Sequence, residues 1–428
     1  FQLCLKEGLT VFRDQQFSGD QRGHAVRRID DVLALRARQF REDAGPLAHP
    51  VRPESFVEIN NFYTATVYEK GAEVIGMLKR LVGEAGYRAA LDLYFERHDG
   101  QAATIEDWLK VFEDATGRDL AQFKLWYSQA GTPRVRVGET FDNGTYTLTL
   151  SQAVPPTPGQ DEKAPMVIPV AMGLISKEGR ELAPTRVLEL TEAEQSWTFE
   201  RLPERPVPSL LRGFSAPVIV EREASVEERL TLLAHDTDPF NRWEAGRALA
   251  KDTLARMITE GAAPDPAYLE ALGRLAADEA LDPAFRALAL RLPSADDMAQ
   301  TLAEAGVVPD PQRIWEATRD LRGAIAEALE PTLAALHDAM AVPGPYTPDA
   351  AAAGRRALRA QALTLLTRRD SGARARAQFE AADNMTETLA ALGPLIEAGA
   401  AEEALAAFEA RWRDDRLVMD KWFALQVA

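Results

Sequence analysis

The sequence predicts a multidomain protein in which a helical region is followed by a β-sandwich and then by a second, all-α region. Apolar residues recur at helical spacing over residues 1–132 and alternate with polar residues beyond Pro133. From about Ser225 the composition becomes rich in Ala, Leu, Glu and Arg, and the alternation stops. We therefore predict domains at residues 1–132, 133–224 and 225–428.

The first region carries recognisable helix start and stop signals. Thr104 followed by Asp107 is typical of a capping box, and Gly117 marks the end of that helix. A further helix is expected over residues 120–129, and the run 131–133 (Gly-Thr-Pro) stops it. The aromatic residues expected to face inward from this helix are Phe123, Trp126 and Tyr127.

The second region shows the period of two that strands produce. Val135 and Val137 alternate with arginines, the turn Asp-Asn-Gly follows at residues 142–144, and alternation resumes over residues 145–150. Further short runs are expected to be strands at residues 167–175, 186–190, 197–199 and 217–220. Together they predict a small β-sandwich of about a hundred residues.

The third region is predicted to be all-α. Helices are expected over residues 226–234 and 242–251, with a break at residues 236–239. Helix pairs without an intervening strand resemble a superhelical array of the HEAT type, although there is no strict sequence period. The last helix runs through residues 419–426 without a cap, and we expect the chain to be truncated at this end.

Charge and composition exclude several classes of function. A net charge of −17 argues against a nucleic-acid surface, because binding phosphates requires clustered Lys and Arg. No apolar run approaches the ~20 residues that cross a bilayer, so no membrane segment is expected. Cys4 is the single cysteine, which excludes an internal disulfide and suits a reducing compartment. We expect a cytoplasmic protein.

Three short segments carry the chemistry. Glu7 lies within the run 5–12 (Leu-Lys-Glu-Gly-Leu-Thr-Val-Phe), and the segments 60–63 (Asn-Asn-Phe-Tyr) and 67–71 (Val-Tyr-Glu-Lys-Gly) follow. This arrangement resembles the zinc aminopeptidases of the aminopeptidase N family, which are gluzincins, in their bacterial form. The resemblance covers essentially the whole chain, with further matches at residues 94–100, 126–133, 213–218, 241–245 and 417–426. It implies that the first region is the helical half of a thermolysin-like catalytic domain.

The resemblance implies that Glu7 is one of three ligands of a single zinc ion. In the family, the two other ligands and the general base belong to an H-E-x-x-H helix that precedes this position. The chain contains five histidines, which are His24, His49, His98, His235 and His337. None of them is followed by Glu and by a second His four positions later, as in H-E-x-x-H. We therefore expect an internal fragment with an incomplete zinc site. The alternative is that Glu7 is an ordinary solvated carboxylate.

The resemblance also implies roles for three further residues. Tyr68, early in a helix expected over residues 64–82, would donate a hydrogen bond to the oxyanion of the reaction, and its alternative role is that of a core tyrosine. Asn60 and Tyr63 would contact the substrate, or else simply form a turn. Lys6 and Asp14 could orient Glu7, but surface charge pairing explains them equally well, and neither belongs to the predicted site. 

The function implied is that of a zinc-dependent aminopeptidase, which releases single residues from the free N-termini of peptides. The fragment alone is not expected to be active, and a monomer with peptide substrates is expected. One alternative is a non-catalytic scaffold that binds peptides or proteins and derives from the same fold. Another is a zinc enzyme that catalyses a different hydrolysis.

Overall fold

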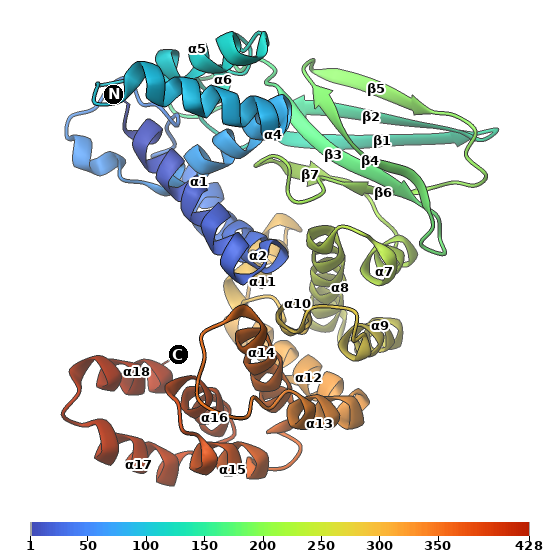
Figure 1. Cartoon of the computed structure of the whole chain (residues 1–428). Coiled ribbons are helices and arrows are strands. Elements are labelled where there is room, and N and C mark those ends of the chain that lie inside the picture. Colours follow the sequence, from blue (N-terminus) through green and yellow to red (C-terminus); the bar gives the residue numbers. More distant parts are fainter. Residues whose placement is uncertain (1, 428) are drawn as a thin grey trace. The chain divides into compact units, whose positions relative to one another are not determined.

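A computed structural model describes residues 2–427 of the chain, whose secondary structure confirms the predicted fold class (Figure 1). Helices are followed by strands and then by helices again. The chain divides into two compact units, Phe1–Arg242 and Trp243–Ala428. The boundaries of the three predicted domains stay predictions.

The helical region begins the first unit. Its α-helices are α1 (Leu3–Arg22), α2 (His24–Ala34), α3 (Phe40–Asp43), α4 (Gly71–His98), α5 (Ile105–Thr116) and α6 (Leu125–Ser128). Three other helical segments lie between them: the π-helices η1 (Leu35–Gln39) and η3 (Thr66–Lys70), and the 3₁₀-helix η2 (Ile59–Phe62). The helix expected over residues 64–82 is thus a π-helix that continues directly into α4. At Gly83, φ is 75°, and this kink interrupts α4 where the predicted helix ends.

Two glycines allow α1 and α4 to cross at very close range (Figure 1). A Cβ atom added to Gly8 would lie 2.9 Å from the carbonyl carbon of Gly71, which is closer than real Cβ atoms approach backbone. The same helices are in contact along their length, with Phe12 of α1 packed against Gly76 of α4. The crossing therefore fixes the start of α1 against η3.

Substitution of Gly8 by Ala is expected to destabilise the first unit by about 1–3 kcal/mol, because a methyl group would force the two backbones apart. Urea denaturation followed by circular dichroism measures this change. Gly76→Ala is the matched control on the facing helix, since its Cβ would lie 3.5 Å from the Phe12 ring in ordinary contact. Equal stabilities of the two variants would contradict this account of the crossing.

The end of the helical region differs partly from expectation. Thr104 and Asp107 form the predicted capping box, and Gly117 ends α5 in the left-handed conformation. The helix expected over residues 120–129 is reduced to α6, which follows a series of turns. The backbone amides of residues 125–127 donate to the carbonyl three residues earlier, whereas an α-helix would use the carbonyl four residues earlier. The three expected aromatic residues are nevertheless buried, and the Trp126 indole donates to the Val167 carbonyl at 2.8 Å.

Seven strands form the sandwich in two sheets. The strands are β1 (Arg134–Asp142), β2 (Thr145–Ala153), β3 (Ile168–Ile175), β4 (Glu181–Leu190), β5 (Glu194–Phe199), β6 (Val207–Leu210) and β7 (Ile219–Glu221). Their orders are β5-β2-β1-β7 and β4-β3-β6, and only the β1–β7 pair is parallel among the pairs described. The predicted turn joins β1 to β2 with positive φ at Asn143 and Gly144, as a two-residue hairpin requires. Strand β6, which contains Pro208 and lies at the edge of the second sheet, was not predicted.

One hydrophobic core extends through the helical region and the sandwich. It contains Trp108, Phe112 and Trp126 from the helices together with Tyr146 and Met172 from the strands, all of them fully buried. The sequence placed a boundary near Pro133, but no break in the core occurs there. The sandwich therefore supports the helices that carry the candidate site.

The remaining helices follow the sandwich. Helix α7 (Val226–His235) starts with a capping box of Ser225 and Glu228, and α8 (Pro239–Glu260) follows it. The second unit continues with α9 (Pro266–Ala277), α10 (Pro283–Ala289), α11 (Ala295–Glu304), α12 (Pro311–Ala328), α13 (Glu330–Ala339), α14 (Ala350–Leu366), α15 (Ala373–Ala381), α16 (Met385–Glu397), α17 (Glu402–Trp412) and α18 (Arg416–Val427). None of the helices between residues 2 and 427 combines the length and apolar character needed to cross a membrane.

Candidate functional site

Glu7 lies in the second turn of α1, just before the glycine at the helix crossing. Its neighbours Leu5 and Gly8 are buried, whereas the Glu7 side chain keeps 12% of its surface exposed. The Lys6 ammonium forms an ion pair with the Glu7 carboxylate. Glu7 is therefore a mostly buried, charge-paired carboxylate near the start of α1.

The structure brings three of the four predicted residues to one place. The Tyr63 and Tyr68 rings lie 6.2 Å apart between centroids, at 45° to each other. The Lys6 ammonium that pairs with Glu7 also lies 5.7 Å from the centroid of the Tyr63 ring. Lys6 thus connects Glu7 to Tyr63, and Tyr63 contacts Tyr68. Lys6 was not predicted to belong to the site, since surface charge pairing explained it equally well from sequence. Its contact with Tyr63 depends on tertiary structure.

The environment of Tyr68 favours the protonated phenol. Tyr68 belongs to η3 and is half-buried, as expected for the flank of the helix. Burial, the nearby Tyr63 and the Glu69 carboxylate together raise the pKa of Tyr68. A phenol with a raised pKa remains a hydrogen-bond donor at neutral and mildly alkaline pH.

Asn60 and Asp14 take part in other interactions. Asn60 is exposed in η2, where its backbone amide donates to the Glu58 carboxylate at 3.0 Å. This contact is typical of the turn-forming role, and a contact of Asn60 with substrate stays a prediction. Asp14 pairs with Arg27 at 3.2 Å.

The residues present supply one carboxylate towards a zinc site. Between residues 2 and 427, no group of three or more His, Cys, Asp or Glu side chains is arranged to hold a metal ion. A hydrolytic zinc site needs three protein ligands and an open position. Glu7 has the right chemistry for one of these ligands, and the described residues do not complete the set.

A buried ion pair anchors the end of η3. The Lys70 ammonium lies 2.8 Å from the Asp43 carboxylate and 2.9 Å from the Gly131 carbonyl oxygen, and both charged side chains are 1% exposed. The Thr132 hydroxyl also donates to Asp43 at 2.9 Å. Burial opposes ionisation of Asp43, but the charge and hydrogen bond of Lys70 lower the pKa of this carboxyl overall. This pair ties the Tyr68 segment to the segment that enters the sandwich.

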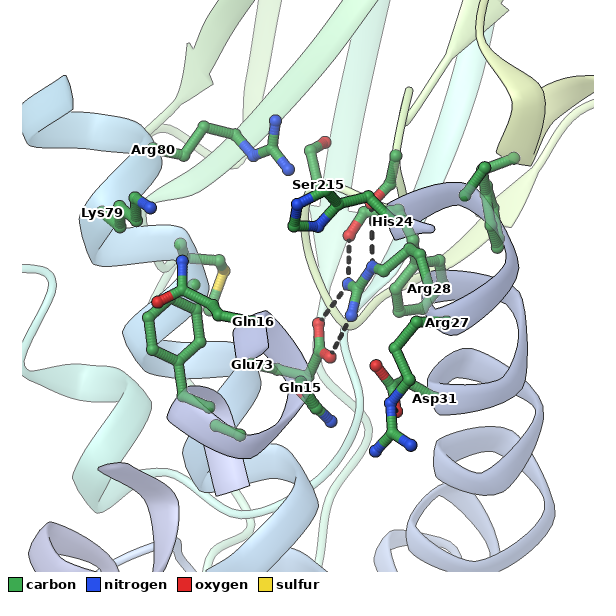
Figure 2. Close-up of a pocket in the computed structure, with 18 of the residues that line it drawn as sticks. Gln15, Gln16, His24, Arg27, Arg28, Asp31, Glu73, Lys79, Arg80 and Ser215 are labelled. Carbon is green, nitrogen blue, oxygen red and sulfur yellow. Dashed lines mark hydrogen bonds and ion pairs between the residues drawn. The ribbon is translucent and has the colours of Figure 1, made fainter. Parts of the chain in front are cut away.

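A pocket of about 720 Å³ lies elsewhere in the first unit (Figure 2). It is lined by the second half of α1, by α2 and α4, and by residues around Gly213 and Phe240. Within it, the Arg28 guanidinium forms two bonds of 2.6 Å with Glu73 and donates to the carbonyls of Gly213 and Phe214. Burial disfavours the charged form of Arg28, but the Glu73 carboxylate raises its pKa overall.

The charges in this pocket are largely paired with one another. Arg27 bonds Asp31 at 2.9 Å, and Lys79 bonds Glu84 at 2.9 Å, in addition to the Arg28–Glu73 pair. None of the four predicted site residues lines the pocket. We therefore place the candidate site at the start of α1 beside η3, where the Glu7 carboxylate and a protonated phenol are grouped.

The fold is a helical region followed by a β-sandwich and an all-α region, and comparisons with known proteins match all three parts. The peptidase family M1 domain matches residues 1–127. A domain of unknown function with an Ig-like fold matches residues 131–223, and one with ARM repeats matches residues 226–428. The helical region thus matches the peptidase M1 family, and the two regions that follow it match domains of unknown function.

Similarity to individual relatives extends over the whole chain. Aminopeptidase N of Caulobacter vibrioides is 50% identical and aminopeptidase N of Escherichia coli K12 is 40% identical, each over 100% of this chain and 50% or 51% of the relative. The crystal structure of Legionella pneumophila aminopeptidase A in complex with aspartic acid has a TM-score of 0.86 at 27% identity, covering 100% of this chain and 49% of that chain. The chain thus spans about half the length of the relatives it matches.

Proposed function

We propose that this chain is part of a longer zinc-dependent aminopeptidase, which releases single residues from the free N-termini of peptides. The observation that carries the proposal is the grouping of Glu7, Tyr63 and Tyr68 at the start of α1 beside η3. Similarity to two bacterial aminopeptidases N over the full chain supports it. Monomeric state and cytoplasmic location stay predictions.

The proposed roles follow from the chemistry of each side chain. Glu7 would give one oxygen ligand to zinc, which when bound supplies the Lewis acid for hydrolysis. The protonated Tyr68 phenol would donate a hydrogen bond to the oxygen of the scissile carbonyl as negative charge develops there. Asn60 and Tyr63, with Tyr63 51% exposed, would contact the substrate.

The test is hydrolysis by the longer protein. We expect it to release a dye from an alanyl substrate, to lose this activity on chelation and to regain it with zinc, and to leave an N-acetylated substrate intact. Glu7→Gln should lower the bound zinc per chain, whereas the neighbouring surface variant Asp14→Asn should not. The 428-residue chain alone should not release dye. Binding of peptides without hydrolysis by the zinc-loaded longer protein would instead identify a scaffold.

A further inference from the structure

Two π-helical segments lie against each other next to Tyr68. The Gln39 side-chain amide at the end of η1 donates to the Thr66 hydroxyl of η3 at 3.3 Å, and Arg38 bonds Glu69 at 3.1 Å. π-Helical turns are rare, and they occur frequently at functional sites. Here η3 carries Tyr68 itself, and η1 contacts η3.

Glu42 holds the first residue of η3. Both the backbone amide and the hydroxyl of Thr66 donate to the same Glu42 oxygen, each at 2.7 Å. The first amides of a helix have no partner within the helix, and a carboxylate is a favourable acceptor for them. Glu42 lies on α3, which continues directly from η1, so its position is fixed by that segment. Thr66 is fully buried, which makes these bonds hard to replace with water.

The turn before Thr66 is held from a second side. His49 Nδ1 lies 2.8 Å from the Pro50 carbonyl oxygen and therefore carries a proton, since a carbonyl can only accept. In the neutral ring, Nε2 then accepts a hydrogen bond from the Thr64 hydroxyl, at 3.0 Å. The Thr64 hydroxyl oxygen in turn accepts a hydrogen bond from the Val67 amide at 3.3 Å, and the Thr64 carbonyl oxygen accepts one from the Tyr68 amide at 3.1 Å.

These contacts matter because a π-helical hydrogen bond spans five residues and an α-helical one spans four, so a π-helical segment accommodates one extra residue. One residue corresponds to about 100° of rotation around an α-helix, at 3.6 residues per turn. If η3 relaxed to an α-helix, Tyr68 would rotate by about this angle relative to the buried face of α4. The phenol would then no longer point to the same place beside Tyr63 and Glu7.

We propose that Glu42 is a positioning residue, which holds η3 in its π-helical form through Thr66 and thereby sets the direction of the Tyr68 phenol. The catalytic consequence rests on the proposed function. The positional consequence does not, since it concerns the ring of Tyr68 in the chain as it is. The two can be measured separately.

The positional test uses the 428-residue chain with 3-fluorotyrosine at its eight tyrosine positions and fluorine NMR, where Tyr68→Phe identifies the Tyr68 signal. Glu42→Ala should shift this signal and leave those of the buried Tyr127 and Tyr146 in place. Glu42→Gln should return the Tyr68 signal to its wild-type position, because a single amide oxygen can accept both hydrogen bonds from Thr66. Glu54→Ala is the control, since Glu54 is 77% exposed and makes one long ion pair of 3.7 Å with Arg52.

An unchanged Tyr68 signal in Glu42→Ala, or an equal shift in Glu42→Gln, would overturn the proposal. If Glu42→Ala does not fold, Thr66→Val decides the matter, because it removes the hydroxyl bond to Glu42, and with it the longer bond from Gln39, in nearly the same shape. A smaller shift confined to the Tyr68 region supports the proposal, and no shift in Thr66→Val contradicts it.

The catalytic test uses the longer protein. Glu42→Ala should lower kcat by about 10-fold to 10²-fold with little change in KM, and Glu42→Gln should stay close to wild type. A KM effect alone would contradict positioning of Tyr68. If the unmodified longer protein hydrolyses no peptide, the proposed function fails, while the fluorine measurement still decides the positional role of Glu42.

Discussion

Tyr68→Phe is expected to lower kcat of the longer aminopeptidase by roughly 10²–10³, the usual effect of losing one oxyanion donor. The ring of the variant keeps its contact with Tyr63, so the substitution removes the hydroxyl and little packing. Because Tyr68 is half-buried on the flank of η3, folding stability should change little. The measurement is steady-state kinetics on an alanyl substrate, together with thermal unfolding of both proteins.

A control separates loss of the donor from general damage. Tyr94→Phe removes a hydroxyl from a half-buried tyrosine of α4, whose ring packs edge-on against Trp108 at 5.1 Å, outside the candidate site. It should leave kcat unchanged. The assignment of Tyr68 as oxyanion donor fails if Tyr68→Phe keeps nearly full kcat, or if KM alone responds.

Lys70→Met is expected to destabilise the first unit by about 3–5 kcal/mol, because it leaves the Asp43 carboxylate buried without its cation. The Gly131 carbonyl also loses its donor. Lys79→Met is the matched control in the adjoining α4, where the partner Glu84 is 81% exposed, and we expect a loss of at most about 1 kcal/mol. Urea denaturation at neutral pH compares the two variants.

The effect of Lys70→Met should depend on pH in a defined direction. In the unmodified chain the folded pKa of Asp43 is below its ordinary value of 3.8, so its stabilising contribution is present above that value and is lost as the pH falls further. Without Lys70, burial raises the pKa of Asp43, and acid then protonates it in the folded state. The stability difference between variant and wild type should therefore narrow between about pH 7 and about pH 4.5. A constant difference would show that the charge of Asp43 does not cause the loss.

Much of the local structure was predictable from sequence because its signals are local. The capping box at Thr104 and Asp107 and the hairpin turn at Asn143 and Gly144 each depend on a few consecutive residues, and both form as predicted. The prediction over residues 120–129 was wrong in extent. There, hydrogen bonds to the sandwich, such as that of Trp126, fix the chain in tighter turns.

By itself the sequence determined the order of helical, sandwich and all-α regions, and it singled out Glu7, Tyr63 and Tyr68. The tertiary structure alone decided that the helical region and the sandwich share one core, and that Lys6 joins Glu7 to Tyr63. It also decided that Tyr68 lies on a π-helix held by Glu42. The physical reason is that periodicity reports which face of an element is buried, whereas the residues that cover that face come from distant parts of the chain.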